Sequence, residues 1–455
     1  DASATEFNIL FDERVHVAGN DSKLLSQEMN LLQGMSLIAH NNAKFEEKDF
    51  ESIRKLGDSR KKLDVQKTGR FGIGFNSVYH LTDFPCFVSG RHIVMFDPHR
   101  FCLPRALLQH GDPGTRVDFL QDEFYDKFSD QFAPFDGLFG CDLKSGKDEY
   151  NGTLFRFPLR NEEQSKLSQI SETWYTREDI LSLLESFSQE AALDILFLKH
   201  VQKIGVYHQE VGKPSPTKLF SISVDSDDEK RSRINRILEN AVNLKTFFED
   251  SKSLQYSYEL SVTQQWYEKT GNVSRINNQK WVVSCYLDTE GEAKDLSLKA
   301  FLNKIDARMI PFGQVGACIY DSDQPDRTNL AIDDARAYCF LPMPNSTGLS
   351  VHVNAFFELS SSRRDLWKGS ATGLEGVAAI RAKWNDALIA SVLGPAYTHL
   401  AYELRVRKDV SDAQLYSLFP KFDLGGLTWR PLIDTFYLLL SQSSINMLRD
   451  LQDHL

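Results

Sequence analysis

The glycine-rich string at residues 69–75, Gly-Arg-Phe-Gly-Ile-Gly-Phe, restricts the fold of this chain more than any other part of the sequence. Glycine lets a backbone turn through conformations that other residues avoid and lets it approach a ligand closely. Phe75, Val78 and Tyr79 follow with helical spacing, and a helix N-terminus offers unpaired N–H groups to an anion. The string therefore indicates either a phosphate cradle or, more simply, a tight loop packed against a sheet.

Two common phosphate-binding motifs do not match this string. No Gly-Lys-Ser/Thr follows the glycines, as a P-loop would require. The flanking residues also do not form the strand–turn–helix–strand unit that accompanies a dinucleotide fingerprint. The phosphate interpretation consequently depends on a different kind of nucleotide site.

Composition excludes several broad classes. The chain has 455 residues, enough for about two to four domains. Its 52 Lys and Arg against 63 Asp and Glu give a net charge of −11, which argues against a nucleic-acid binder, because Lys and Arg supply most phosphate-backbone affinity. The six cysteines have no CxxC spacing, so we predict no zinc site and a reducing compartment. No apolar run approaches the ~20 residues needed to span a bilayer, so we expect no membrane insertion.

Strand-like and helical patterns alternate along the chain, which predicts an α/β fold. A helix is expected from Arg177 to about residue 190, with Thr176 as its N-cap. From residue 372 the pattern is mostly helical. The expected strands, including a hairpin at 86–99, cover residues 5–10, 33–39, 86–99, 153–160, 203–208, 281–287 and 349–359.

The complete string GRFGIGFNSVY, residues 69–79, resembles the second glycine box of the GHKL ATPases, and most of all the version in the ninety-kilodalton heat-shock chaperone. Gly152-Thr153 fits the last nucleotide-contacting element of that family, and Asp1-Ala2 matches the end of its first box. Residues 352–367 resemble the segment from which the chaperone presents an arginine to the γ-phosphate. Longer stretches resemble a module that one branch of the family repeats along its chain, namely GRFGIGFNSVYHLTDFPCFVSG, MFDPH, QFAPFDGLFG, GTLFRFPLR, FFELSSSRRDLW and KWNDALIASVLGPAY.

This resemblance implies an architecture and a function. It implies an N-terminal two-layer α/β sandwich of the GHKL ATPase (Bergerat) type over residues 1–165, a chaperone-middle-like α/β domain over 166–370 and a helical segment over 371–455. The first boundary stays open between about 160 and 225. The implied function is a cytoplasmic chaperone module that couples the binding or hydrolysis of ATP, with magnesium, to protein clients or co-chaperones. Neighbouring repeats of the same chain are further expected partners.

The resemblance also implies the site residues. Arg363 or Arg364 would stabilise charge on the γ-phosphate, with Arg363 favoured. No protein ligand for a metal is expected among the residues of this chain. The residues expected to contact nucleotide are Asp1, Asn42, Gly69, Arg70, Phe71, Gly72, Ile73, Gly74, Phe75 and Thr153.

Two departures from the family pattern weaken the ATPase interpretation. The catalytic Glu and the magnesium-binding Asn of the family would precede Asp1, so we expect this chain to be a piece of something longer that lacks the general base. The first glycine box normally reads D-x-G-x-G, whereas residues 40–45 read HNNAKF and place Asn42 at the Asp position. An Asn oxygen accepts a hydrogen bond without charge assistance. A nucleotide-free scaffold for protein interactions therefore remains the alternative, and a histidine kinase is a distant third.

Overall fold

A computed structural model gives the fold of most of the chain. The predicted site residues Asp1, Gly69, Arg70, Phe71, Gly72, Ile73, Gly74 and Arg363 lie outside the residues that it describes. The described residues are 3–16, 21–53, 75–108, 112–121, 123–143, 148–226, 232, 248, 254–303, 309–360, 364–367, 377–422 and 426–442.

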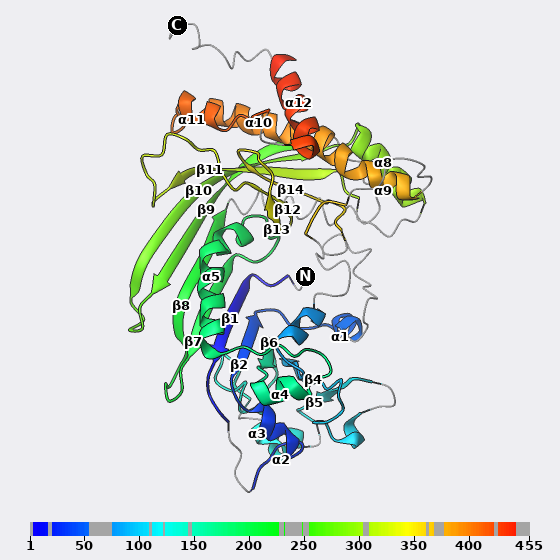
Figure 1. Cartoon of the computed structure of the whole chain (residues 1–455), viewed down its shortest axis with the longest axis vertical. Coiled ribbons are helices and arrows are strands. Elements are labelled where there is room, and N and C mark those ends of the chain that lie inside the picture. The colour runs from blue at the N-terminus through cyan, green and yellow to red at the C-terminus, as the bar shows by residue number, and fades with distance from the viewer. Residues whose placement is uncertain are drawn as a thin grey trace.

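One large sheet dominates the structure, and the predicted α/β class is confirmed (Figure 1). Its 14 strands have the order β13-β12-β14-β11-β10-β9-β8-β7-β1-β2-β6-β3-β4-β5. Among these described strands, only the pairs β1–β7 and β12–β14 are parallel. The strands are β1 (Glu6–Asp12), β2 (Ser36–Asn41), β3 (Cys86–Gly90), β4 (His92–Phe96), β5 (Gly114–Asp118), β6 (Tyr150–Pro158), β7 (Lys203–Gln209), β8 (Thr217–Ser226), β9 (Leu254–Tyr267), β10 (Val273–Leu287), β11 (Phe312–Asp321), β12 (Arg336–Cys339), β13 (Leu341–Ser346) and β14 (His352–Ala355).

The N-terminal part of the sheet buries side chains on both faces, because successive residues of a strand point to opposite sides. Phe155 of β6 and Phe87 of β3 pack under helix α1 (Glu47–Ile53) and the 3₁₀-helix η3 (Phe75–His80). We call this side the α1 face. Leu154 points to the opposite side, which we call the far face. The far face is covered by residues from the short helices η1 (Glu28–Leu32), α2 (Phe124–Lys127) and α3 (Ser129–Phe132).

The two halves of the sheet meet where β1 lies parallel to β7, with Glu6 opposite Lys203 and Asp12 opposite Gln209. Helix α5 (Arg177–Ile195) covers this seam and packs its buried Ile180 and Leu184 into the same core as Phe11 of β1. The helix begins as the sequence predicted, because Thr176 and Asp179 form a reciprocal capping box. Strands from both sides of the predicted boundary at residue 165 therefore belong to one sheet. The domain limits themselves stay a prediction.

A buried ion-pair network fixes the seam at the carboxyl ends of β1 and β7. Glu13 Oε1 accepts a hydrogen bond from Arg177 Nε at 2.6 Å and lies 2.9 Å from His208 Nε2. The His208 ring stacks on Phe11, with ring centroids 5.4 Å apart. One carboxylate thus connects β1, β7 and the start of α5.

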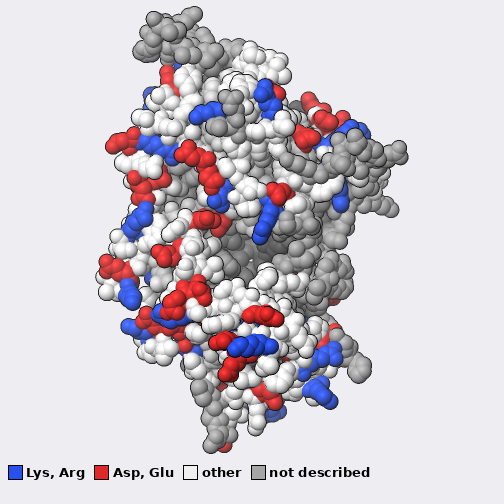
Figure 2. Space-filling model, viewed as in Figure 1, with Lys and Arg blue, Asp and Glu red and all other residues white. Residues whose placement is uncertain are grey.

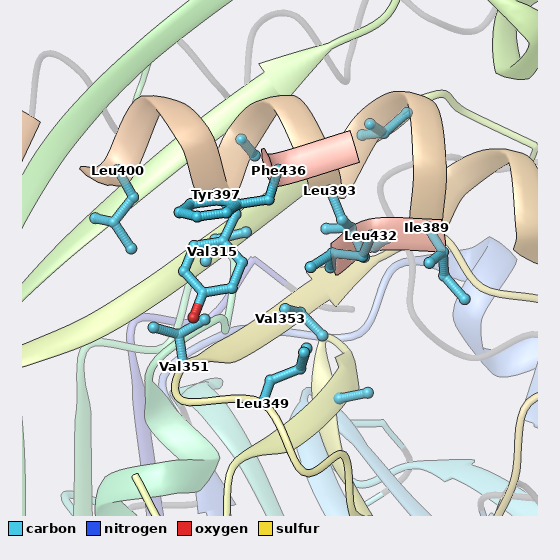
Figure 3. Packing of buried hydrophobic residues seen from close by; sticks show 14 of the residues in the cluster. Val315, Leu349, Val351, Val353, Ile389, Leu393, Tyr397, Leu400, Leu432 and Phe436 are labelled. Atoms are coloured by element: carbon cyan, nitrogen blue, oxygen red, sulfur yellow. The ribbon is translucent and has the colours of Figure 1, made fainter. Parts of the chain in front are cut away.

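The C-terminal helices cover one face of the other half of the sheet. These are α8 (Glu292–Leu302), α9 (Val377–Ala387), the π-helical turn η5 (Leu388–Leu393), α10 (Gly394–Arg405), α11 (Asp412–Ser417) and α12 (Gly426–Gln442). Figure 3 shows Tyr397, Leu400 and Phe436 pointing toward Val315 and Val351. Helices α10 and α12 touch closely at Gly394, where an added Cβ would lie 2.6 Å from the Thr435 side chain.

Because the sheet is continuous, we predict that a destabilising substitution in the N-terminal half also destabilises the C-terminal half. All six tryptophans of the chain follow residue 173, so their fluorescence reports only the C-terminal half. We expect Leu154→Ala, at a fully buried position on the far face, to lower the free energy of unfolding by about 3 kcal/mol. The tryptophan transition in urea should shift together with the far-ultraviolet circular dichroism. An unchanged tryptophan transition would contradict a coupled sheet. Leu427→Ala, at a fully exposed position of α12, is the control.

Asp194, near the end of α5, gives stability a distinctive pH dependence. Burial, reinforced by Glu190 and opposed by Arg336, raises the pKa of Asp194 from its ordinary 3.8 to about 6. The folded chain then holds a proton that the unfolded chain has released, so this residue makes stability fall as pH rises from about 4 to about 6. We expect Asp194→Asn to remove that decline and to stabilise the fold at neutral pH by about 1 kcal/mol, a figure reduced for partial exposure. Urea titrations across that window measure the effect, and parallel curves for the two proteins would contradict it.

Candidate functional site

Thr153 lies on the α1 face where β2, β3 and β6 meet, opposite Asn41 and Ser89. It shares this face with Phe155, because the two residues are two positions apart on one strand. The Thr153 hydroxyl donates to the carbonyl of Ala43 at 2.7 Å and lies 2.8 Å from Ser89 Oγ. Its side chain is fully buried. The hydroxyl therefore anchors the segment that follows β2 to the two neighbouring strands.

Asn42 lies beside Thr153, because its neighbour Asn41 is the strand partner of Thr153. Its exposed side chain turns toward the beginning of β1. Oδ1 accepts from the backbone N–H of Thr5 at 2.9 Å and of Glu6 at 3.1 Å, and Nδ2 donates to Thr5 Oγ1 at 2.8 Å. The structure thus brings these two predicted nucleotide contacts close together, with the polar atoms of both already bonded within the chain.

His40, which precedes these residues on β2, is neutral at physiological pH. Burial lowers its pKa to about 4, although Glu6 opposes the shift. Its Nδ1 lies 3.0 Å from Asn8 Nδ2, and the ring stacks on Phe139 at 4.8 Å between centroids. An acceptor role for Nδ1 follows, because the Asn amide nitrogen has only protons to offer. His40 is thus a packed structural residue of the far face.

Phe75, the described end of the glycine string, begins η3 and enters an aromatic cluster on the α1 face. Its ring centroid lies 5.1 Å from that of Phe96 and 6.2 Å from that of Phe155. Phe45 and Phe50 complete the cluster from the α1 side. The apolar residues after the glycines therefore hold the helix start against the same face that carries Thr153.

The other end of η3 is held by Arg160, a residue that the sequence reasoning did not single out. Its guanidinium is buried and donates four hydrogen bonds. The acceptors are Asp83 Oδ1 at 2.6 Å and the carbonyls of Tyr79 at 2.9 Å, His80 at 2.6 Å and Thr173 at 3.0 Å. Arg160 therefore bonds the last carbonyls of η3 and ties them to the segment that leads into α5.

Asp83 extends this network to two further segments. Its Oδ1 also accepts from Ser168 Oγ at 2.9 Å, and its Oδ2 lies 3.7 Å from His99 Nε2. The stretches FNSVYHLTDF, MFDPH and GTLFRFPLR thus converge here. Asp83, His99 and Arg160 are distant in sequence and come together in the folded chain, in which β6 pairs with β3. The only available sequence signal was an Arg that ends a strand-like stretch.

Arg364 is exposed and lies in a turn after β14, next to Asp365. The turn is closed by the N–H of Ser360 to the carbonyl of Asp365 at 2.9 Å and the N–H of Trp367 to the carbonyl of Glu358 at 2.8 Å. Asn385 of α9 holds its base. Its Oδ1 accepts from the Glu358 N–H at 2.9 Å, and its Nδ2 donates to the carbonyls of Glu358 at 2.8 Å and Trp367 at 3.1 Å. These contacts end β14 at Ala355, earlier than the sequence predicted.

The structure does not place Arg364 next to Thr153. Strand β14 is separated from β6 in the sheet by β11, β10, β9, β8, β7, β1 and β2. The role of either arginine at a nucleotide stays a prediction.

A pocket of about 210 Å³ also opens on the α1 face, between α1, β4 and β5. Phe50, Ile53 and Phe96 form its apolar wall, and an ion pair of 2.8 Å between Glu47 and Arg116 lies at its rim. Neither Asn42 nor Thr153 lines it. The pocket is therefore a separate feature from the predicted nucleotide contacts.

Neither a metal centre nor a membrane span is found in the part of the chain that the structure describes. No group of three or more His, Cys, Asp or Glu side chains there is arranged to hold a metal ion. No described helix is long and apolar enough to cross a bilayer. Figure 2 shows acidic and basic side chains interspersed over the described residues of one face, without a broad patch of one sign.

Removing Arg160 should cost more stability than removing a surface cation. We expect Arg160→Ala to lower the free energy of unfolding by about 3 kcal/mol, because Asp83 and three carbonyls lose their donor. Arg160→Lys should recover only a part, since an ammonium group cannot reproduce the planar fork. Lys166→Ala, which removes an exposed ion pair with Glu162, should change stability by less than about 0.5 kcal/mol. Equal losses in the three proteins, measured in urea, would show that the network does not stabilise η3.

Comparisons with known proteins identify relatives of this chain. Residues 1–221 match the family model described as the Sacsin domain. The chain is 32% identical over 473 aligned residues to human Sacsin, an alignment that covers 98% of this chain and 10% of that protein. The chain thus spans about a tenth of the length of this relative. A crystal structure of the N-terminal domain of a DNA repair protein aligns with 86% of this chain at 11% sequence identity, and the alignment covers 92% of that protein's chain. The TM-score of 0.31 is too low to support a shared fold.

Proposed function

Since this chain is a sacsin-like protein whose residues 1–221 match the Sacsin domain, we propose that it is a chaperone-type module that binds ATP, with magnesium, on the α1 face. Nucleotide state would be coupled to protein clients or co-chaperones in the cytoplasm. A GHKL-type sandwich over the N-terminal part belongs to the same proposal. The observation that supports it is the location of Thr153 on the same sheet face as Phe155, against which Phe75 packs at the start of η3, with Asn42 next to Asn41, the strand partner of Thr153.

Residues of this chain would have separate roles at the bound nucleotide. The amides around Gly72 and Gly74 would bind phosphate at the start of η3. Arg363 or Arg364 would stabilise charge developing on the γ-phosphate. Magnesium would neutralise the phosphate oxygens. Arg160 would keep η3 in place from its far end, and Asn385 would hold the turn that carries the two arginines.

The predicted base contacts fit a nucleotide only in part. Asn42 would have to give up its three hydrogen bonds to Thr5 and Glu6 before it could accept from an adenine amino group. At about 1 kcal/mol each, that exchange costs about 3 kcal/mol, or about two orders of magnitude in affinity. We therefore propose that ATP binds weakly, and not with the low-micromolar affinity expected if the Asn42 oxygen had no other hydrogen bond.

The same contacts support a second candidate function. With the side chains of Asn42 and Thr153 satisfied internally, the fold is complete as a protein scaffold without nucleotide. In that case the module would act through its surface, on protein partners or on neighbouring copies of the same module. The two candidates differ in one measurable property, saturable binding of ATP.

Calorimetric titration of ATP and ADP with magnesium separates the candidates. We expect weak, saturable ATP binding that Gly74→Val abolishes, because a side chain there would block close approach of phosphate. Gly34→Val is the matched control, since an added Cβ at Gly34 meets no atom within 4 Å. Asn42→Asp should strengthen binding about tenfold, because a carboxylate accepts a stronger hydrogen bond. No binding up to millimolar ATP, in a chain shown to be folded, would leave the scaffold as the function.

Turnover requires a second protein, extended upstream to include the Glu and Asn of the family pattern. In that protein Arg363→Ala or Arg364→Ala should lower the rate of hydrolysis and leave ATP affinity nearly unchanged, as expected for a group that acts mainly in the transition state. An equal loss of affinity and rate would assign the arginine to ground-state binding instead.

A further inference from the structure

Four polar side chains of the N-terminal half have a buried atom with no hydrogen-bond partner among the described residues. The atoms are Arg156 Nε, His16 Nε2, Gln33 Oε1 and Ser36 Oγ. Arg156 is 3% exposed, Gln33 2% and Ser36 1%. Burying a polar group without a partner is unfavourable, and native proteins rarely leave several together. We call these four residues the orphan cluster.

Strand register brings the orphan cluster to one end of β1, β2 and β6. Ser36 lies opposite Asp12 on one side and Pro158 on the other, and Arg156 lies opposite Ile38. Arg156 and Ser36 therefore share the far face with Leu154, because they are an even number of positions from it or from its strand partners. The face is opposite to the one that carries Thr153.

Two backbone contacts complete the assembly. The Nη2 of Arg156 donates to the carbonyl of Gly34 at 3.1 Å. The N–H of His16 donates to the carbonyl of Gln33 at 2.9 Å. The Arg156 side chain and the His16 backbone are thereby anchored to the segment just before β2, beside Ser36.

The orphan cluster also carries an uncompensated positive charge. The carboxylate that acts on Arg156, that of Asp12, bonds Arg14 instead, whose N and Nε donate to Oδ1 at 3.0 and 2.9 Å and whose Nη2 donates to Oδ2 at 2.8 Å. Within the described residues, Arg156 has no ion pair of 4.0 Å or less. One buried guanidinium therefore has no counter-ion.

Among the described residues, neither His16 nor Cys86 removes that charge at neutral pH. Burial, and then the charges of Arg14 and Arg156, lower the pKa of His16 to about 4, so its ring is neutral. Burial raises the pKa of the adjacent Cys86 thiol to about 11, so no thiolate forms. The two guanidiniums and the one carboxylate leave a net charge of +1.

We propose that the orphan cluster is a binding site for a free inorganic oxyanion, namely hydrogen phosphate. A water molecule would satisfy the N–H and O–H groups but would leave a buried cation uncompensated, which is costly. An oxyanion supplies both negative charge and several acceptors for Arg156 Nε, Ser36 Oγ and His16 Nε2. Gln33 Oε1 would accept the proton that hydrogen phosphate carries and sulfate lacks, so the site should prefer phosphate.

The site lies near the surface and is independent of the proposed nucleotide site. Arg14 is 24% exposed along its side chain, His16 is half-buried and Val15 between them is exposed. The segment after β1 is therefore the part of the site nearest the surface. The two sites lie on opposite faces of the sheet, so failure of one proposal does not bear on the other.

Thermal unfolding of the 455-residue chain, in phosphate, sulfate and chloride at equal ionic strength, tests the site. Both multivalent anions stabilise proteins generally by exclusion from the surface, so the sulfate series measures that background. We expect phosphate to raise Tm by about 2 °C or more above sulfate at saturation. Arg156→Met should abolish the difference, whereas Arg275→Met on the exposed part of β10 should keep it. Equal effects of phosphate and sulfate in the unchanged chain would overturn the proposal.

A second measurement needs no variant and covers the case in which Arg156→Met does not fold. The pKa of His16, followed by NMR, should rise by about one unit or more when phosphate replaces chloride, because a bound anion favours imidazolium. The same pKa in both salts would contradict the site. A rise in phosphate that sulfate reproduces in full would overturn the preference for hydrogen phosphate.

Discussion

The parallel pairing of β1 with β7 is the interaction on which the rest of the structure depends. It joins the two halves of the sheet and creates the line along which α5 packs. Glu13 holds the seam because one carboxylate oxygen binds Arg177 and lies beside His208. Without that pairing β1 would be a sheet edge, and the cores on the two sides would have separate boundaries. The chain thus has one framework in which both the α1 face and the arginine-bearing turn are fixed.

The α1 face and the far face use the same strands for different chemistry, because adjacent residues of β6 point in opposite directions. Thr153 and Phe155 lie on the α1 face, which η3 covers, whereas Leu154 and Arg156 lie on the far face. On the first face the polar groups are satisfied by the chain. On the second, a cation and three further polar atoms are not. The alternation explains how one strand contributes to two sites that share no side chain.

Local features of the sequence predicted local structure well. The capping pair Thr176 and Asp179, the hairpin of β3 and β4, and the α/β class follow from patterns within a few residues. The sequence did not reveal the interactions that close over long separations. Asn42 was predicted to contact a base from its place in a motif, but its partners Thr5 and Glu6 become evident only once β1 and β2 pair. Arg160 was missed for the same reason, since its acceptors lie some 80 residues earlier and 13 residues later.

The seam also sets an order of events during synthesis. Glu6 pairs with Lys203, so about 200 further residues must be synthesised before the second strand neighbour of β1 exists. At ribosomal rates of 5–20 residues per second, that takes about 10–40 s. Throughout that interval one side of β1 presents unpaired backbone groups, which are a template for any other strand. When two copies of this chain are made close together, the β7 of one copy has the same residues as the β7 that the unpaired β1 of the other requires. Correct folding of each copy therefore depends on its own β7 reaching β1 first.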